Sequence, residues 1–147
     1  MVKTWKKFAG LFLFGAALLG VTSSAKAQVA PSLPPTWKVT VTGNAATKAA
    51  GRQDFTEFVY IESTSFTGDQ ICKLGMQQTA LTLTAGTTTG TYNVSCTMHS
   101  NTQGDVTFTG TVSNTQMSGT ISWVIGTTTY TYTYTGVPYT PDPSVLP

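Results

Sequence analysis

Apolar and polar residues alternate with a period of two through the second half of the chain. Threonine and serine occupy most of the polar positions. This alternation is typical of β-strands with one buried face. It predicts four strands, over residues 92–98, 106–112, 117–125 and 129–135. The connections between these strands are short, which predicts that successive strands are antiparallel neighbours.

The first half of the chain carries a less regular pattern. A strand is predicted over residues 37–41, and residues 45–51 are expected to form a loop or one helical turn. Residues 54–62 predict a strand that is apolar on both faces, which requires cover on both sides or a bulge. Two shorter apolar runs, 71–76 and 80–84, bring the prediction to about eight strands in one all-β, antiparallel meander.

A meander of this size leaves two exposed edge strands unless the sheet closes on itself. Closure into an up-and-down barrel removes both edges, so this is the predicted fold. Gly110 and Gly119 fall on the inner face, where glycine allows tight coiling of the strands. A β-sandwich is the alternative. An outer-membrane barrel is disfavoured, because its strands need about 9–11 residues and the middle runs are shorter.

The first 27 residues have the pattern of a secretory signal peptide. Three lysines among the first seven residues precede an apolar run over residues 8–21, and Ala-Lys-Ala follows at residues 25–27. The run is shorter than the ~20 apolar residues of a membrane-spanning helix, and the two alanines suit the small pockets of a signal peptidase. We therefore expect cleavage after Ala27, a periplasmic or secreted mature protein, and no membrane span after cleavage.

Proline marks both flanks of the predicted barrel domain. Residues 28–35 contain three prolines and predict an extended linker. Residues 137–147 contain four and predict a tail. The barrel domain is therefore expected over residues 36–136.

Removal of the signal peptide changes the sign of the net charge. The full chain has 8 basic and 6 acidic side chains, and four of the basic ones lie in residues 1–27. The mature chain then has four basic and six acidic side chains, which gives a net charge of −2. Without a basic excess, it is not expected to bind nucleic acid by neutralising phosphates.

Cys72 and Cys96 are predicted to form a disulfide, because disulfides persist in exported proteins. Such a bond stabilises a fold by roughly 3 kcal/mol. The predicted strands oppose it. The run 80–84 separates the two cysteines by two strand spacings, about 9.6 Å, whereas bridged Cα atoms lie about 4.4–6.8 Å apart. Either the bridge does not form or residues 75–79 are not a simple hairpin, and two buried thiols are the alternative.

Residues 54–136 repeat two structural motifs, glycine close to an apolar run and aromatic residues alternating with threonine. Phe108-Thr-Gly-Thr-Val, Met117-Ser-Gly-Thr and Tyr134-Thr-Gly are examples. The segment resembles small secreted bacterial β-meander domains of uncharacterised function and, more loosely, the closed meanders of lipocalins and avidins. The resemblance implies a fold and no activity. Avidin-like biotin binding needs a particular set of tryptophans, and only Trp37 and Trp123 remain in the mature chain, so no binding residue is carried over.

The polar residues predict no catalytic or metal-binding arrangement. His99 is the single histidine, and strand alternation places it on the opposite face from Cys96, the nearest candidate nucleophile. The same alternation separates His99 from Met98, a further copper-ligand type. Glu57 and Glu62 fall on opposite faces, so they are not expected to act as a glycosidase pair, and single charges on an edge strand serve to block aggregation. We expect no enzyme activity, no metal and no cofactor.

The aromatic residues of the mature chain are the feature that most suggests a function. Seven are predicted to line the inner face as a cup for a small apolar or aromatic ligand: Trp37, Tyr92, Phe108, Trp123, Tyr130, Tyr132 and Tyr134. The alternative is that these rings fill the core of a small barrel. A second functional hypothesis is a structural or cell-envelope surface protein, since low charge, threonine-rich faces and proline-rich ends suit association with other chains. The oligomeric state is left open.

Overall fold

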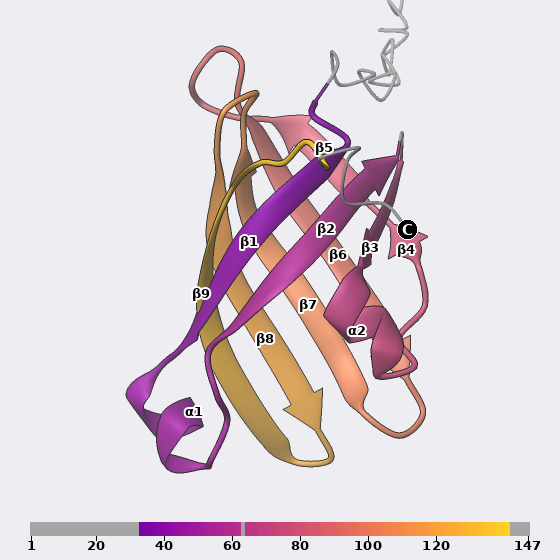
Figure 1. Cartoon of the computed structure of the whole chain (residues 1–147), viewed down its shortest axis with the longest axis vertical. Coiled ribbons are helices and arrows are strands. Elements are labelled where there is room, and N and C mark those ends of the chain that lie inside the picture. Colours follow the sequence, from indigo (N-terminus) through magenta and orange to yellow (C-terminus); the bar gives the residue numbers. More distant parts are fainter. Residues whose placement is uncertain (1–32, 63, 142–147) are drawn as a thin grey trace, which may run out of the picture.

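Nine antiparallel strands form one barrel-shaped sheet (Figure 1). The computed structural model describes residues 33–62 and 64–141. Two short helices, α1 (Ala45–Ala49) and α2 (Asp69–Lys73), lie towards the lower end of the barrel as drawn. The strands are β1 (Thr36–Gly43), β2 (Phe55–Glu62), β3 (Ser65–Gly68), β4 (Thr79–Ala80), β5 (Thr82–Ala85), β6 (Tyr92–Ser100), β7 (Gly104–Val112), β8 (Met117–Ile125) and β9 (Thr128–Pro138).

The strands follow one another around the barrel in chain order. The first and last strands meet, because β1 pairs with β2 on one side and with β9 on the other. In that last pairing Val41 lies opposite Tyr134. The sheet order is β4-β3-β2-β1-β9-β8-β7-β6-β5. The predicted all-β meander is confirmed, and the sheet forms a nearly closed barrel rather than a sandwich.

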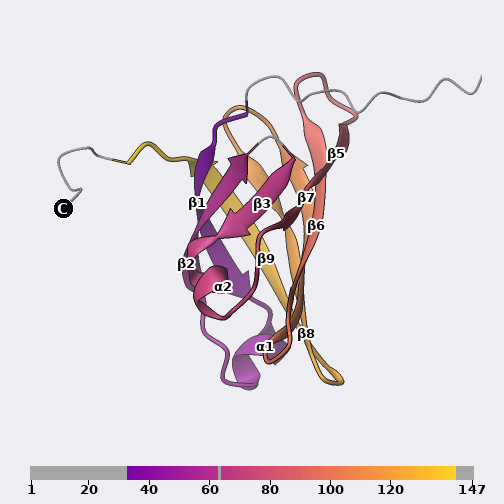
Figure 2. The same cartoon turned by 90° about the vertical axis from the view of Figure 1, so that its right-hand side faces the viewer.

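The barrel is not fully closed, because its two edge strands, β4 and β5, do not pair with each other. Both belong to one extended segment, residues 79–85. Its first part, β4, pairs with β3, and its second part, β5, pairs with β6 at the opposite edge (Figure 2). Between the two parts, the amide of Leu81 donates a hydrogen bond to the carbonyl oxygen of Thr64 over 2.7 Å. The Leu81 side chain is buried. The segment therefore crosses the gap and joins the two edges of the sheet.

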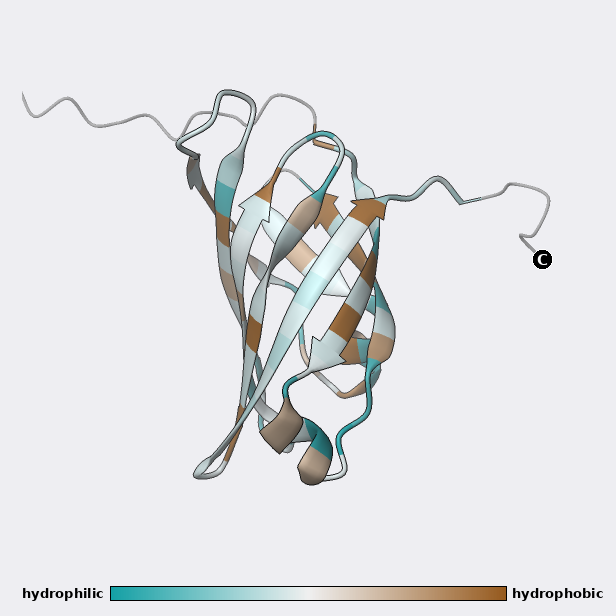
Figure 3. Cartoon of the chain, turned by 90° about the vertical axis from the view of Figure 1, so that its left-hand side faces the viewer, coloured by the Kyte–Doolittle hydropathy of each residue, from teal (hydrophilic) through white to brown (hydrophobic). Residues whose placement is uncertain are grey.

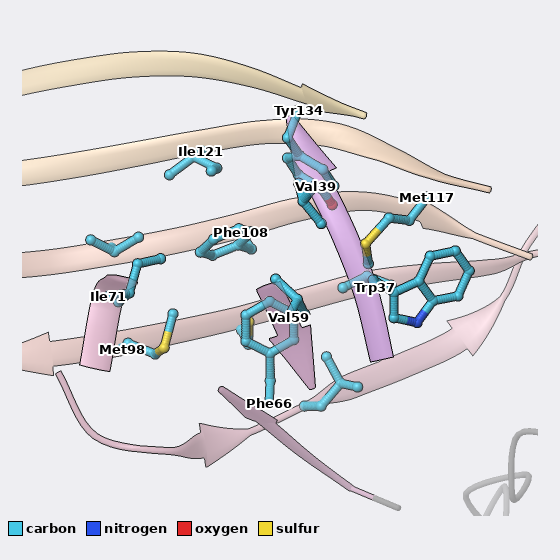
Figure 4. Packing of buried hydrophobic residues seen from close by; sticks show 14 of the residues in the cluster. Trp37, Val39, Val59, Phe66, Ile71, Met98, Phe108, Met117, Ile121 and Tyr134 are labelled. Carbon is cyan, nitrogen blue, oxygen red and sulfur yellow. The ribbon is translucent and has the colours of Figure 1, made fainter. Parts of the chain in front are cut away.

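The period-two pattern sorts the side chains as predicted. In β6, every second residue from Tyr92 to Ser100 is buried and the residues between them are exposed. Figure 3 shows the alternation as brown and pale bands along the strands. The inward-facing side chains form one hydrophobic cluster (Figure 4). Within it, the ring centroid of Phe108 lies 4.9 Å from that of Phe66 and 5.6 Å from that of Tyr134, so rings from three strands meet inside the barrel.

Strand β2 is apolar on both faces because both faces are covered. Val59 and Ile61 are buried in the core. On the outer face, Phe58 packs against Tyr139, with ring centroids 4.9 Å apart. The amide of Tyr139 donates to the carbonyl oxygen of Thr36 over 2.9 Å, which fixes the segment that follows β9 against the sheet.

The strand predicted over residues 71–76 is wrong, because the helix α2 covers the first part of this run. The carboxylate of Glu57 accepts hydrogen bonds from the amides of Gln70 (2.8 Å) and Ile71 (3.1 Å) in the first turn of α2. These amides are among those that a helix start leaves without a partner. Ile71 is the one buried residue of α2 and anchors it to the core. A run this short does not distinguish helix from strand by periodicity.

The other boundaries differ less from the prediction. The helix α1 is the helical turn given as one alternative for residues 45–51. The strand β3, only four residues long, was not predicted. The strand β9 continues through Pro138, two residues into the predicted tail.

The predicted disulfide is wrong, since Cys72 and Cys96 are both free. Cys72 lies on α2 and is exposed, and its sulfur lies 2.8 Å from Oγ1 of Thr67. Cys96 points from β6 into the core and is 4% exposed. One thiol on the outside and one inside cannot be bridged without moving the backbone.

Several predicted features fall outside the described residues. They include the signal peptide with its cleavage site after Ala27, residues 28–32 of the linker and residues 142–147 of the tail. Within the part of the chain that the structure describes, no helix is long and apolar enough to cross a lipid bilayer.

Candidate functional site

The structure buries most of the seven aromatic residues that were predicted to bind a ligand. Tyr130 is partly buried, and the other six belong to the buried cluster: Trp37, Tyr92, Phe108, Trp123, Tyr132 and Tyr134. They are spread along the barrel, since Trp37 and Tyr92 lie near the beginnings of β1 and β6, at the upper end in Figure 1. They therefore do not share one cup, and their role in binding stays a prediction.

Three of the seven come together at the lower end of the barrel. Trp123 and Tyr130 are directly opposite each other across β8 and β9. Tyr132 meets Phe55 edge to face, with ring centroids 5.8 Å apart. The indole Nε1 of Trp123 donates to the carbonyl oxygen of Gln103 over 2.6 Å. This bond satisfies the only donor of the indole and fixes the orientation of its ring.

A pocket of about 390 Å³ opens beside this aromatic group, and we name it the end pocket. Its size falls within the range of roughly 300–1,000 Å³ of small-molecule sites. The start of β2, the helix α2 with the residue after it, and β8 form its walls. The lining residues are Phe55, Thr56, Gln70, Ile71, Lys73, Leu74 and Trp123.

The end pocket presents apolar surface to solvent. Leu74 is 38% exposed, although large apolar side chains elsewhere in the described chain are mostly buried. Phe55 is partly buried and packs against the core. An apolar wall with a few polar groups is the usual composition of a ligand site.

Glu57 holds the α2 wall of the end pocket in place. Besides the two amides of α2, its carboxylate accepts a hydrogen bond from the amide of Phe58 over 3.0 Å. Burial raises the pKa of Glu57, and the hydrogen bonds to its carboxylate oppose that rise. A Cβ at Gly68 would lie 3.0 Å from the carboxylate carbon of Glu57. Glycine at position 68 therefore leaves room for the Glu57 carboxylate to cap the start of α2, which we call the Glu57 cap.

The prediction that Glu57 blocks strand pairing as an exposed charge is wrong, because its side chain is fully buried. Its predicted placement on the face opposite Glu62 is confirmed, since Glu62 is exposed. The structure thus gives Glu57 a structural role that the spacing of acidic residues did not indicate.

Arg52 lies against the aromatic group at the same end of the barrel. Its guanidinium carbon is 5.1 Å from the ring centroid of Trp123 and 4.6 Å from that of Tyr130. Tyr132 is close enough for the charge of Arg52 to oppose the rise in the pKa of Tyr132 that burial causes. The sequence predicted Trp123 as a binding residue. It did not predict Arg52, because Arg52 and Trp123 are far apart in the sequence and come together only when the barrel closes.

A second pocket, of about 420 Å³, lies on the outer surface beside β6 and is lined mainly by amide and hydroxyl groups. His99 lines it, with Nδ1 2.5 Å from Asp105 and Nε2 3.1 Å from Asn101. The hydrogen bond to Asp105 raises the pKa of His99. The predicted separation of His99 from Cys96 is confirmed, since the His99 side chain is 67% exposed and Cys96 is buried. Both ring nitrogens have partners, so we place the candidate site at the end pocket.

The described residues contain no group of three histidine, cysteine or acidic side chains placed to hold a metal ion. The fold and the end pocket define a small up-and-down β-barrel with a partly apolar pocket at one end. Comparison of the chain with models of protein families, with curated proteins and with solved structures finds no match in any of the three.

Proposed function

We propose that this chain is an exported binding protein that takes a small molecule with an apolar or aromatic body into the end pocket. The observation that carries the proposal is the pocket of about 390 Å³ beside Trp123, with Leu74 38% exposed in its wall. Covering such apolar surface is favourable by roughly 25 cal/mol per Å². A ligand that lies between Leu74 and the Trp123 ring would remove this surface from water.

The packing around the pocket supports binding without a large rearrangement. The hydrogen bond from Trp123 to Gln103 fixes one wall, and the Glu57 cap fixes the other. Walls that are already ordered lose little conformational entropy when a ligand binds. Export is supported by the basic start, the short apolar run and the Ala-Lys-Ala sequence of the first 27 residues.

The proposal is tested by titrating the protein with N-phenyl-1-naphthylamine, a neutral aromatic probe whose fluorescence rises in an apolar environment. We expect saturable binding with one site per chain. Leu74→Gln should weaken it roughly three- to eightfold, because full burial of leucine is worth about 1.5–3 kcal/mol and about two fifths of this side chain is exposed.

Val124→Gln is the matched control. Val124 is 37% exposed, almost the same as Leu74, and it follows Trp123 on β8 but points to the outer face. The control should leave the affinity unchanged. If the probe does not saturate, or if both variants lower its affinity equally, the end pocket is not a binding site.

A further inference from the structure

The positive charges around the end pocket have no acidic counterpart in its walls. Lys73 lines the pocket directly, and none of the lining residues is acidic. Arg52 lies against Trp123, which is itself a lining residue. Among the described residues, neither Arg52 nor Lys73 forms an ion pair.

The acidic residues closest in sequence to Arg52 are already engaged. Asp54 pairs with Lys48 at 2.9 Å and accepts a hydrogen bond from the amide of Gly43 at 2.9 Å. The Glu57 carboxylate is occupied by backbone amides. Asp69 precedes Lys73 by four residues on α2 but forms no ion pair with it, so the cations of the end pocket have no ion-pair partner among the described residues.

The position of Arg52 suits an anion attached to a flat apolar body. Its guanidinium carbon lies over the rings of Trp123 and Tyr130, so the aromatic faces orient the group. Contact with a ring face leaves guanidinium N–H donors free to bind a carboxylate, sulfonate or phosphate oxygen, often as a pair of parallel bonds. The only hydrogen bond of Arg52 within the described residues is from its backbone amide to Thr47.

We propose that the ligand of the end pocket is a small amphipathic anion, with its apolar body between Leu74 and Trp123 and its acidic group at Arg52 and Lys73. This inference rests on the proposed function and adds the charge of the ligand. It predicts that, of two molecules with the same apolar body, the protein selects the one with the acidic group.

Two fluorescent probes with the same ring system test the inference: neutral N-phenyl-1-naphthylamine and 1-anilinonaphthalene-8-sulfonate, which adds one sulfonate. We expect the full chain to bind the sulfonate at least about tenfold more tightly, the size of one charge-assisted hydrogen bond. Arg52→Gln should remove most of this preference and leave the affinity for the neutral probe within about twofold.

Lys38→Gln is the matched control, since it removes the same charge from the exposed face of β1, away from the end pocket. It should leave both affinities unchanged. Equal affinity for the two probes, or an equal effect of Arg52→Gln on both, overturns the anion inference and leaves the proposed function standing. If the neutral probe does not saturate, the proposed function fails and the inference fails with it. The affinity of Arg52→Gln for the neutral probe reports whether that variant has kept its fold.

Discussion

Tyr134 offers a direct test of the packing inside the barrel. It is 2% exposed, and its hydroxyl is buried without a hydrogen-bond partner among the described residues (Figure 4). The hydroxyl faces Gly110 and Gly119, which lie opposite each other across β7 and β8. A Cβ on either glycine would come within 2.7–2.8 Å of the hydroxyl oxygen, so the two glycines make the space that it occupies.

The substitution Tyr134→Phe removes the hydroxyl and keeps the ring, including its packing against Phe108. Burying a hydroxyl without a partner costs about 1–3 kcal/mol. We therefore expect the free energy of unfolding to rise by about 1–3 kcal/mol, which is the reverse of the usual effect of a substitution in the core. Burial also raises the pKa of Tyr134 well above its ordinary value of 10.0, in agreement with a site that disfavours the phenolate.

Urea unfolding followed by tryptophan fluorescence measures the effect. With an m-value of roughly 2 kcal/mol/M, a gain of about 2 kcal/mol moves the midpoint up by about 1 M and leaves the slope unchanged. Tyr92→Phe is the control, because Tyr92 is 9% exposed and is not among the residues with a buried unpaired oxygen. A lower midpoint for Tyr134→Phe would refute the reasoning, since it would mean that the hydroxyl has a favourable partner such as a buried water.

Three further predictions concern titratable groups. Because burial raises the pKa of Glu57, folding favours its protonated form. The wild-type protein should therefore gain stability relative to Glu57→Gln as the pH falls from 7 through the raised pKa to the ordinary value of 4.5. Urea midpoints of both proteins at several pH values measure this gain, and a difference that does not change with pH would contradict it. A thiol reagent should label Cys72 in the folded protein, because this side chain is exposed. It should label Cys96 only in denaturant, because Cys96 is buried and burial raises its pKa to about 12. Rapid labelling of both cysteines in the native protein would show that the Cys96 side chain does not point into the core. The pKa of His99, read from its ring protons by NMR, should lie above its ordinary value of 6.5 and fall in Asp105→Asn, and no change in that variant would show that the hydrogen bond is absent in solution.

The sequence was sufficient to predict the strands with a regular alternation. The strands β6, β7, β8 and β9 lie where the period of two placed them, because each has one face in the core and one in solvent. Closure of the sheet also followed from the number of strands and the cost of free edges. The region between β2 and β6 was predicted poorly, since a helix of five residues and a strand of four are too short for periodicity to separate them.

The candidate site could be predicted only in part, for a different physical reason. Trp123 was identified from its place on the inner face of a regular strand. Arg52 and Leu74 belong to the connections after α1 and α2, and such connections carry no periodicity that indicates a partner. Their approach to Trp123 depends on how the barrel closes. The disulfide prediction failed for another reason, because it rested on the redox state expected of an exported protein, whereas the fold leaves Cys72 exposed on α2 and Cys96 buried in the core.

The pairing of β1 with β9 has a consequence for how the protein is made. The β1 edge is completed by the 11-residue strand β9, so a nascent chain that lacks β9 cannot close the barrel. Until that strand emerges, β1 and β8 each present a row of unsatisfied backbone groups, which are templates for pairing with other chains. Pairings between distant parts of a chain also form slowly. Resistance to aggregation is therefore acquired in one step, when β9 docks between β1 and β8.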